Sequence, residues 1–476
     1  MRFLSDELIE RILDEAYKLL EAKGVALYHE SLPGRLAEGG CVLDADGKHV
    51  RMPRELVETA VRSAPRRVEL WNIAGDSYSD LSGENIHFTP GSTAIKMLDE
   101  KSHRMRPVST NDMLRCGKLV EQLDAIDYSA TAVVPNDVPK AIGDSIRLYA
   151  LLKTTSKAIV TGAFTIEGFG VMAEMHLAVR GTAEALRAKP FTIFSCCPSS
   201  PLKWSTTTAD NVARCAELGI PVELVSMPLA GLVSPISLVG CVIQHTAETL
   251  SGIVISQTVR PGAPILYGGS PGAFDMRTMA ATVSAVEAQM IGCAYIEVGK
   301  YLGLPTQAYI GVSDSKNLDA QAGFESGGGF YLAGLAGINS VSGPGMHYFE
   351  SCMSLEKLVF DAQICEITRR LAAGLEPRED FPADDLFDQL LRERTLLTAD
   401  HTLKYFRQEH CIPGPLIDRT QIENDTSGTP DLMQRAHTEV KHRLEQYEPP
   451  EVLSAEQRRD LESVMSAAAG DFKMGF

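Results

Sequence analysis

Eight short apolar runs, each followed by a stretch of helical periodicity, constrain the fold of this chain more than any other feature. Each run has the length and the β-branched or aromatic content of a buried strand, and a polar or Gly- and Pro-rich loop separates it from the next helix. The runs are 86–89, 128–134, 158–162, 191–196, 221–226, 264–268, 306–310 and 339–342. Eight strands that alternate with eight helices predict an α/β fold of the (βα)8 TIM barrel type, with a doubly wound open sheet as the alternative.

The segments on either side of this repeat have a different pattern. Residues 1–85 contain an amphipathic helix capped by Ser5, a hairpin with an Asp-Gly turn, and a helix that begins after Pro53. Residues 376–476 contain charged helical patterns without strands between them. We therefore expect a catalytic barrel at 86–375, flanked by an N-terminal helical and hairpin extension and by a C-terminal helical extension. The C-terminal extension is expected to pack on the barrel or on a neighbouring subunit.

The overall charge argues against one class of partner. The chain of 476 residues has a formal net charge of −17. A phosphate backbone requires a basic face on the protein, so nucleic-acid binding is not expected. A small cationic ligand or a basic protein partner suits such a charge, although solubility alone explains it equally well.

Cysteine usage and hydropathy predict a cytoplasmic protein without a membrane span. The apolar stretch 233–259 is interrupted by polar residues such as Gln244 and Glu248, which indicates a buried helix. The N-terminal residues lack the apolar core of a signal peptide. Five cysteines in helical patterns are expected to be reduced core thiols, namely Cys116, Cys215, Cys241, Cys293 and Cys365.

The loop after the seventh predicted strand is the first candidate site. Residues 313–321 combine two hydroxyls, two carboxylates, an ammonium and two amides. In a TIM barrel the chemical groups follow the carboxyl ends of the strands, so Asp314, Lys316 and Gln321 are candidates for substrate binding. An ion pair of Lys316 with Asp314 or Asp319 is favoured over a Schiff-base role for this lysine.

Further candidates lie in or just after other strands. His347, in the Gly-rich loop after the eighth strand, is the candidate catalytic residue. Carboxylates and aromatic rings together suit a quaternary ammonium group, which they hold by charge and by cation–π contacts. For any single aromatic residue, a place in the core is the alternative. The candidates of this kind are Trp204, Glu223, Tyr267, Tyr309, Tyr348, Phe349 and Glu350.

Other chemistries lack their sequence motifs. There is no H-E-x-x-H or H-x-H pattern and no C-x-x-C pair, and a single histidine at a strand end does not make a metal triad, so no metal is expected.

Three stretches resemble the MttB-type family, the trimethylamine:corrinoid methyltransferase superfamily. They are the Asp-Gly hairpin followed by residues 52–57, the loop 311–325 with its Ser-Asp-Ser-Lys and Asp-x-Gln-x-Gly patterns, and residues 400–406. They occur in the family's order, and the resemblance covers nearly the whole chain. It implies a TIM barrel that moves a methyl group from a methylated amine to the Co(I) of a corrinoid, which a separate small protein carries.

The chain departs from this family in one respect. The trimethylamine enzymes contain pyrrolysine, whereas all 476 positions here are standard residues. This departure favours the non-pyrrolysine branch, which acts on quaternary amines such as glycine betaine, proline betaine or carnitine. The resemblance further implies that this chain binds no cofactor tightly, that its partner is a cognate corrinoid protein, and that it forms a homo-oligomer.

The same interpretation assigns roles at the strand ends. His347 or Lys316 pairs with a substrate carboxylate, or His347 approaches the lower face of the corrin ring. Glycines in thin loops leave room for the corrinoid; the predicted cofactor contacts are Gly268, Gly269, Gly311, Gly345 and His347.

Three other classes of function remain as alternatives. One is a betaine-binding or sensing protein without catalysis, which would bind a betaine but not demethylate it. The second is a Schiff-base lyase that uses Lys316, which borohydride would trap with its substrate. The third is a metal-dependent hydrolase, which would contain stoichiometric zinc or iron.

Overall fold

All eight predicted strands are present in the structure, a computed structural model that describes residues 2–421, 428 and 430–474. The strands are short and largely buried, as expected for strands that are covered on both faces. Their bounds are β6 (His87–Thr89), β9 (Ser129–Ala130), β10 (Ile159–Thr161), β11 (Thr192–Cys196), β13 (Val222–Ser226), β15 (Ile265–Gly269), β18 (Gln307–Tyr309) and β19 (Ser340–Ser342).

These strands pair in parallel, in the order in which they occur along the chain. One sheet has the order β15-β13-β11-β10-β9 and another has the order β18-β19-β6. A parallel bridge between Tyr267 and Thr306 joins the two sheets at one edge. At the other edge, the backbone N–H groups of Asp127 and Tyr128 donate to the carbonyl oxygen of Phe88 at 2.8 and 3.2 Å. Each strand therefore neighbours the strands before and after it, and β19 neighbours β6.

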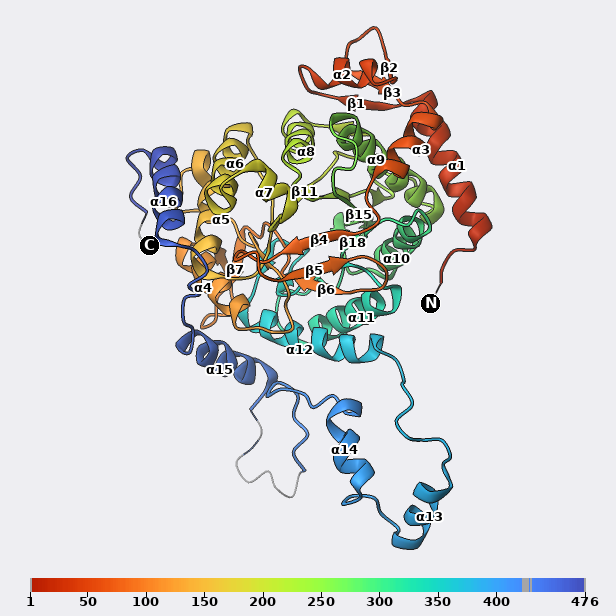
Figure 1. Ribbon diagram of the computed structural model, residues 1–476, viewed down its shortest axis with the longest axis vertical. Helices are drawn as coiled ribbons and strands as arrows, with labels where there is room; N and C mark the ends of the chain where they lie inside the picture. Colours follow the sequence, from red (N-terminus) through yellow and green to blue (C-terminus); the bar gives the residue numbers. More distant parts are fainter. Residues whose placement is uncertain (1, 422–427, 429, 475–476) are drawn as a thin grey trace.

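Helices connect successive strands and surround them (Figure 1). Because the strands are parallel, their carboxyl ends all lie on the same side of the molecule. The connecting helices are α4 (Thr110–Glu121), η1 (Lys140–Ile142), α5 (Gly143–Thr154), α6 (Ile166–Arg180), α7 (Ala183–Ala188), α8 (Thr206–Leu218), α9 (Leu238–Val259), α10 (Val286–Tyr301), α11 (Ala320–Ala336) and α12 (Leu355–Ala372). Short strands in the loops are β7 (Lys96–Leu98), β8 (Met105–Pro107), β12 (Lys203–Trp204), β14 (Leu229–Ala230), β16 (Gly272–Asp275), β17 (Ala280–Thr282), β20 (Met346–His347) and β21 (Cys352–Met353).

The N-terminal segment folds as its sequence predicts. The Ser5 side chain accepts a hydrogen bond from the backbone N–H of Leu8 and caps α1. The hairpin pairs β2 with β3, and Gly47 in its turn has a φ of 70°. Both α1 and α3 pack against α9. The elements are α1 (Asp6–Ala22), β1 (Val25–Leu27), α2 (Leu32–Glu38), β2 (Val42–Leu43), β3 (His49–Arg51), α3 (Arg54–Ser63), β4 (Val68–Trp71) and β5 (Tyr78–Leu81).

The apolar helix α9 is a core element, as predicted. Among the described residues it is the helix that is long and apolar enough to cross a membrane, yet 78% of its most apolar stretch is buried inside the protein. Its Glu248 is buried as well, and both carboxylate oxygens are satisfied: Oε2 accepts from Ser200 and Ser226, and Oε1 accepts from Gln244 and the backbone of Leu202. Through Glu248, helix α9 therefore connects the loop after β11 to the end of β13.

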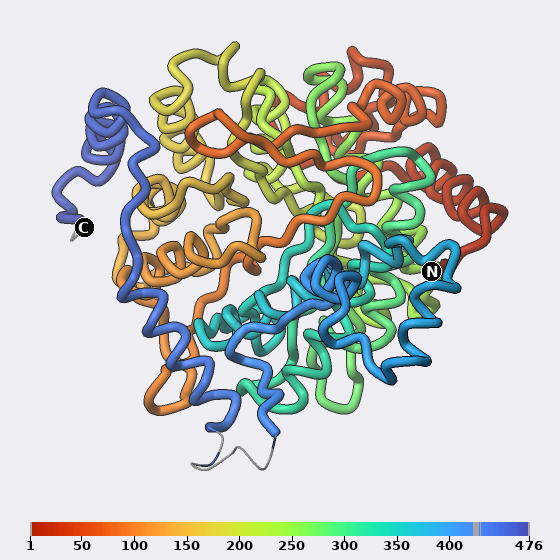
Figure 2. Tube along the Cα trace, turned by 60° about the horizontal axis from the view of Figure 1, so that its bottom comes forward, coloured from red at the N-terminus to blue at the C-terminus, as the bar shows by residue number. Residues whose placement is uncertain are grey.

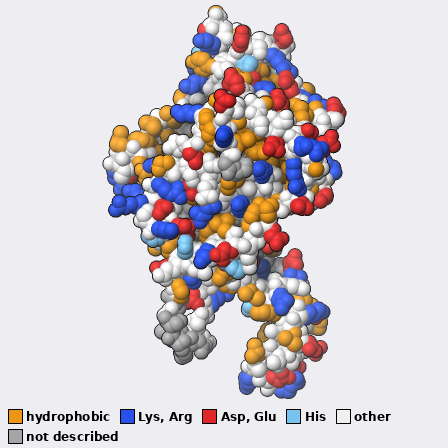
Figure 3. Space-filling view, turned by 90° about the vertical axis from the view of Figure 1, so that its left-hand side faces the viewer, with side chains coloured by type: hydrophobic (Ala, Val, Ile, Leu, Met, Phe, Trp, Pro, Cys, Tyr) orange, Lys and Arg blue, Asp and Glu red, His pale blue; other side chains and the backbone are white. Residues whose placement is uncertain are grey.

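The C-terminal extension divides into two parts. Helix α15 packs on α12 and α4, and α16 packs on α6 and α5, on the side of the molecule opposite α1 (Figure 2). Helices α13 and α14 contain no buried residue and project from the body of the protein, with both apolar and charged side chains on their surface (Figure 3). Packing of the tail on the rest of the chain is thus confirmed for α15 and α16. The bounds are α13 (Asp384–Glu393), α14 (Asp400–Glu409), α15 (Leu432–Glu445) and α16 (Ala455–Ala469).

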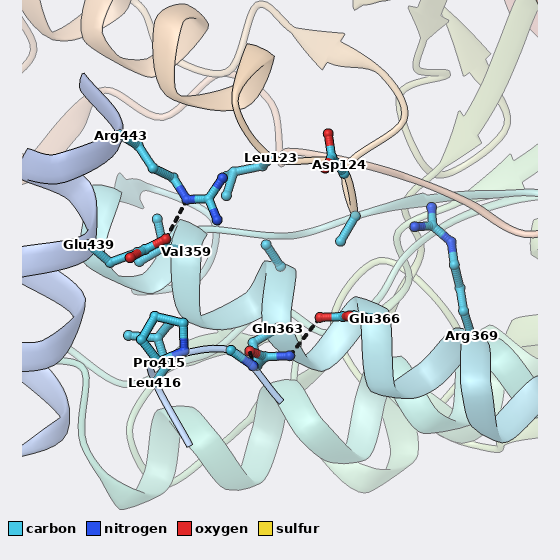
Figure 4. A pocket seen from close by; sticks show the side chains of 13 residues that line it. Leu123, Asp124, Val359, Gln363, Glu366, Arg369, Pro415, Leu416, Glu439 and Arg443 are labelled. Carbon is cyan, nitrogen blue, oxygen red and sulfur yellow. Dashed lines mark hydrogen bonds and ion pairs between the residues drawn. The ribbon is translucent and has the colours of Figure 1, made fainter. Parts of the chain in front are cut away.

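A cavity of about 360 Å³ lies between α12, the end of α4 and the C-terminal extension (Figure 4). Its polar side chains pair within the chain: Arg443 donates to Glu439 at 2.5 Å, and Gln363 donates to Glu366 at 2.8 Å. The lining residue Leu123 precedes β9, so the cavity lies toward the amino ends of the strands. It is therefore separate from the strand ends where the sequence predicts a site.

Candidate active site

Glu223 is the second residue of β13, and its side chain lies on the same face of the sheet as that of Ser195. The strand register pairs Ser195 with Glu223 and Glu223 with Leu266. The Ser195 hydroxyl donates to Oε1 of Glu223 at 2.5 Å, whereas Oε2 has no hydrogen-bond partner among the described residues. Burial raises the pKa of Glu223 to about 7. A buried carboxyl group with one oxygen that lacks a hydrogen-bond partner is a candidate for contact with a cation.

Glu350 reaches the same region through an unusual backbone turn. Tyr348, Phe349 and Glu350 are consecutive non-glycine residues with φ values of 49°, 56° and 62°. Each left-handed residue costs roughly 1–2 kcal/mol, and such strain persists where the surroundings fix the backbone. Here the N–H of Tyr348 donates to the carbonyl oxygen of Ser315 at 3.0 Å. Burial, together with the smaller effect of the nearby charge of Asp314, raises the pKa of Glu350 to about 7.

Tyr309, at the end of β18, lies near both carboxyl groups. Burial raises the pKa of its phenol well above the usual value, and the neighbouring charges of Glu223 and Glu350 act in the same direction. Cys197, just after β11, also lies near both carboxyl groups. It is exposed, so solvent reaches the side of the carboxyl groups on which Cys197 lies. We call Glu223, Tyr309, Asp314 and Glu350 the strand-end cluster.

The loop after β18 is organised by Glu325 on α11. Its Oε2 accepts from the Ser313 hydroxyl at 2.6 Å and from the backbone N–H of Asp314 at 2.9 Å, and Gln321 donates to Oε1 at 2.9 Å. Asp319 caps α11 by accepting from the backbone N–H of Ala322. These hydrogen bonds fix the backbone at Asp314, whose charge lies near Glu350. Gln321 is exposed and contacts the loop through Glu325.

His347 is buried behind the same turn. It has no exposed surface, and neither ring nitrogen has a hydrogen-bond partner among the described residues. Burial and the charge of Lys357 hold the pKa of His347 well below its usual value, so the ring is neutral. Lys357 itself pairs with Asp361 at 2.5 Å and donates to Ser326 at 2.7 Å. A neutral imidazole does not supply the positive charge that a substrate carboxylate requires.

Two predicted aromatic contacts lie outside the strand-end cluster. Tyr267 is opposite Leu224 in the strand register, so it faces away from Glu223, and its hydroxyl donates to Thr246 on α9 at 3.0 Å. The indole N–H of Trp204 donates to Ser251 on α9 at 2.8 Å. Both side chains are fully buried between the strands and the helices.

Lys316 is exposed, and among the described residues it forms no ion pair with Asp314 or Asp319, so the predicted ion pair is wrong. The carboxylate oxygens of Asp314 instead face the backbone N–H groups of Val283 and Ser284, at 3.3 Å each. An exposed lysine that is not desolvated lacks the environment of a Schiff-base nucleophile.

The aromatic residues of the left-handed turn contact each other and a lysine. The ring centroids of Tyr348 and Phe349 are 5.1 Å apart, and the Nζ of Lys96 lies 5.1 Å from the Tyr348 ring. The ammonium group of Lys96 thus lies over the ring of Tyr348.

The four glycines predicted to face a corrinoid are enclosed by protein atoms. A side chain at Gly311 would collide with the ring of Phe330, and one at Gly345 with Met353; their φ values are 78° and 88°. Gly268 and Gly269 lie equally close to Gln307 and His245. Packing within the chain accounts for glycine at these positions, and contact with a corrinoid stays a prediction.

Comparison with known proteins identifies the family. A family model described as trimethylamine methyltransferase (MTTB) matches residues 1–467. The chain is 29% identical over 464 residues to the trimethylamine methyltransferase MttB of Desulfitobacterium hafniense strain DSM 10664 / DCB-2, covering 96% of this chain and 93% of the relative. It is 28% identical over 450 residues to the glycine betaine methyltransferase of D. hafniense strain Y51, covering 94% and 93%.

The chain belongs to the trimethylamine methyltransferase (MTTB) family. It is therefore a methyltransferase of the EC 2.1.1 class, and the resemblance seen in the sequence is confirmed. The fold is similar to that of the crystallised monomethylamine methyltransferase MtmB of Methanosarcina barkeri, with a TM-score of 0.53 and 11% identity over 94% of this chain and 88% of that one.

Within this MTTB-family protein, Arg147 is a candidate site residue that the strand-end pattern does not identify. It lies on α5, is 1% exposed, and stands near the phenol of Tyr309. Burial lowers the pKa of Arg147 to about 10, while Asp144 and Tyr309 act in the opposite direction. An arginine within the otherwise apolar run 146–152 is the signal that could have identified it.

One group of described residues in this MTTB-family chain has the spacing of metal ligands. Ligand atoms of Glu100, of Glu356 in the first turn of α12 and of His437 lie within 4.8 Å of one another. Arg115 and Ser354 donate to the two glutamates, which accounts for their positions without an ion. All ten cysteines are free thiols, and the five predicted core thiols are buried.

Proposed function

We propose that this methyltransferase moves a methyl group from a quaternary amine to the Co(I) of a corrinoid that a partner protein carries. Glycine betaine, or a related betaine such as proline betaine or carnitine, is the proposed methyl donor. The observation that carries this proposal is the strand-end cluster, in which Glu223 and Glu350, each with a pKa raised to about 7, both lie near Tyr309. The relatives named for trimethylamine and for glycine betaine support a methylated amine as the substrate class.

We also infer that the eight parallel strands close into a TIM barrel. The continuous order of pairing from β6 to β19, with β19 beside β6, supports closure. The strand-end cluster then lies at the carboxyl-terminal mouth, where enzymes of this fold hold their substrates. The division into an N-terminal extension, a barrel at 86–375 and a C-terminal extension is proposed with it.

The reaction requires positioning more than acid–base chemistry. The methyl carbon leaves nitrogen for cobalt; the electron pair of the C–N bond stays on nitrogen, and Co(I) supplies the pair for the new Co–C bond. The donor changes from a quaternary cation to a neutral tertiary amine, so no proton must be added for the bond to break. The protein's task is to align the N–CH₃ bond with cobalt.

The strand-end cluster suits the cationic part of the donor. Ionised Glu223 and Glu350 attract the ammonium group, and Tyr309 offers an aromatic ring in the same place. Because a quaternary ammonium donates no N–H hydrogen bond, charge and aromatic contact are the forces available to hold it. His347, as a neutral ring, is proposed to face the corrinoid rather than a substrate carboxylate.

The absence of pyrrolysine from the sequence supports a quaternary amine over trimethylamine as the donor. We further propose that the corrinoid enters with its carrier protein, that this chain holds no cofactor of its own, and that it acts as a homo-oligomer in the cytoplasm. Free thiols at all ten cysteines fit a reducing compartment.

Methylation of free cob(I)alamin, followed by its absorbance, tests the proposal. The donors are glycine betaine, proline betaine, carnitine, γ-butyrobetaine, choline and trimethylamine. Methylcobalamin formed from a quaternary amine and not from trimethylamine supports the proposal. Turnover of trimethylamine alone, or binding of a betaine without methyl transfer to free or carrier-bound corrinoid, contradicts it.

A further inference from the structure

Arg147 is buried with most of its hydrogen-bonding capacity unused. Its Nη2 donates to the carbonyl oxygen of Thr131 at 2.5 Å, but Nε and Nη1 have no acceptor among the described residues. The nearest carboxylate, that of Asp144, lies 4.0 Å from Nη1 and accepts from the backbone N–H groups of Phe164 and Thr165. A desolvated guanidinium with open donors is unfavourable unless a ligand completes it.

Another largely buried arginine shows how such a group is normally satisfied. On α6, Arg180 donates through Nε to Lys189, through Nη1 to Ile73 and through Nη2 to Asn72, all of them carbonyl oxygens at 2.6–2.8 Å. Burial lowers the pKa of Arg180 to about 10, the same direction and cause as for Arg147. The two residues differ in whether the protein itself supplies the acceptors, and Arg180 is less deeply buried than Arg147.

The open guanidinium lies at the strand ends that carry the candidate site. Its acceptor Thr131 directly follows β9, and the ring of Phe164, which follows β10, lies 5.0 Å from the guanidinium carbon. Tyr309, on a strand that is not adjacent to β9 or β10, is close enough to influence Arg147, and it also neighbours Glu223. Arg147 and the two glutamates thus all lie near the same phenol.

This arrangement complements a zwitterion. A carboxylate forms paired, charge-assisted hydrogen bonds with a guanidinium, which also neutralises the buried charge. A quaternary ammonium a few bonds away would then face Glu223 and Glu350. We propose that Arg147 binds the carboxylate of the methyl donor, so that the enzyme acts on betaines with a carboxylate and discriminates against choline and tetramethylammonium. This inference rests on the proposed function and specifies its substrate class.

Calorimetric binding of glycine betaine, choline and tetramethylammonium tests the inference, with wild-type protein, Arg147→Met and Arg180→Met. The wild type is expected to bind glycine betaine at least about tenfold more tightly than choline. Arg147→Met is expected to lose that preference while its affinity for choline stays unchanged. Arg180→Met removes a half-buried guanidinium that the protein itself satisfies, and it is expected to keep the preference.

Equal wild-type affinity for glycine betaine and choline would overturn the inference, even if Arg147→Met fails to fold. A preference that survives in folded Arg147→Met would overturn it as well. Methylation of cob(I)alamin with the same compounds separates the two proposals. If choline is demethylated as efficiently as glycine betaine, the role of Arg147 is wrong and the proposed function stands; if no quaternary amine is demethylated, both fall.

Discussion

The hydroxyl of Ser195 donates a 2.5 Å hydrogen bond to Glu223 from one parallel strand to the next. This bond satisfies one carboxylate oxygen and leaves the other without a partner among the described residues. By contrast, the buried Glu248 on α9 has partners on both oxygens. The difference separates a carboxylate that holds loops together from one that is available to a ligand.

The substitution Glu223→Gln should stabilise the protein more at high pH than at low pH. Burial raises the folded-state pKa from 4.5 to about 7, so the folded protein keeps a proton that the unfolded chain releases in this window. The contribution of Glu223 to stability therefore falls as the pH rises through that window, by about 1.4 kcal/mol per pKa unit. Urea unfolding of the wild type and of Glu223→Gln at about pH 5 and about pH 8 measures this change in the free energy of unfolding.

The exposed Glu174 on α6 provides the matched control for that experiment. Glu174→Gln should change the free energy of unfolding by a similar small amount at both pH values. A Glu223→Gln variant whose stability relative to wild type is the same at both pH values would show that Glu223 ionises normally in the folded protein.

Binding of a quaternary ammonium should release protons near neutral pH. The cation favours the ionised forms of Glu223 and Glu350, so it lowers pKa values that burial has raised to about 7. Affinity should consequently increase as the pH rises through this range and level off above it. Calorimetry of tetramethylammonium in two buffers of different ionisation enthalpy counts the protons. Proton uptake, or an affinity independent of pH, would exclude these carboxyl groups from the ammonium site.

Replacing His347 with Ala should lower methyl transfer by about tenfold or more, because the ring occupies a strand-end position next to the proposed corrinoid site. Both ring nitrogens lack partners among the described residues, so the substitution leaves no polar group of the chain unsatisfied. The melting temperature should accordingly change much less than the activity. His49→Ala in the exposed hairpin is the control. Unchanged turnover in His347→Ala would remove this residue from the site.

Replacing Glu325 with Ala should loosen the loop that presents Asp314. The change removes the acceptor of the Ser313 hydroxyl and of the Asp314 backbone N–H. Loss of such bonds costs about 1–3 kcal/mol locally. Hydrogen exchange at 313–315 should accelerate, and kcat/KM should fall several-fold. Glu325→Gln retains an acceptor and should have a smaller effect; equal effects of the two variants would mean that charge, rather than hydrogen bonding, organises this loop.

The strands and helices of this chain could be predicted because parallel strands covered on both faces form continuous apolar runs. All eight predicted runs are strands, and the capping role of Ser5 is also confirmed.

The site could be predicted only in part, because strand ends identify a region but not the direction of each side chain. Adjacent residues of a strand point to opposite faces, and this places Glu223 beside Ser195 but directs Tyr267 toward α9. Arg147 lies on helix α5, so a prediction based on strand ends does not identify it. Likewise, the exposure of Lys316 follows from tertiary packing that no local pattern specifies.

Single-turnover transfer from glycine betaine with deuterated N-methyl groups to cob(I)alamin tests the central claim most directly. Mass spectrometry should find trideuterated methylcobalamin and dimethylglycine in equal amounts, with formation strongly reduced in Glu223→Gln. Formation of neither product with free or carrier-bound corrinoid, while trimethylamine is demethylated, would contradict the account.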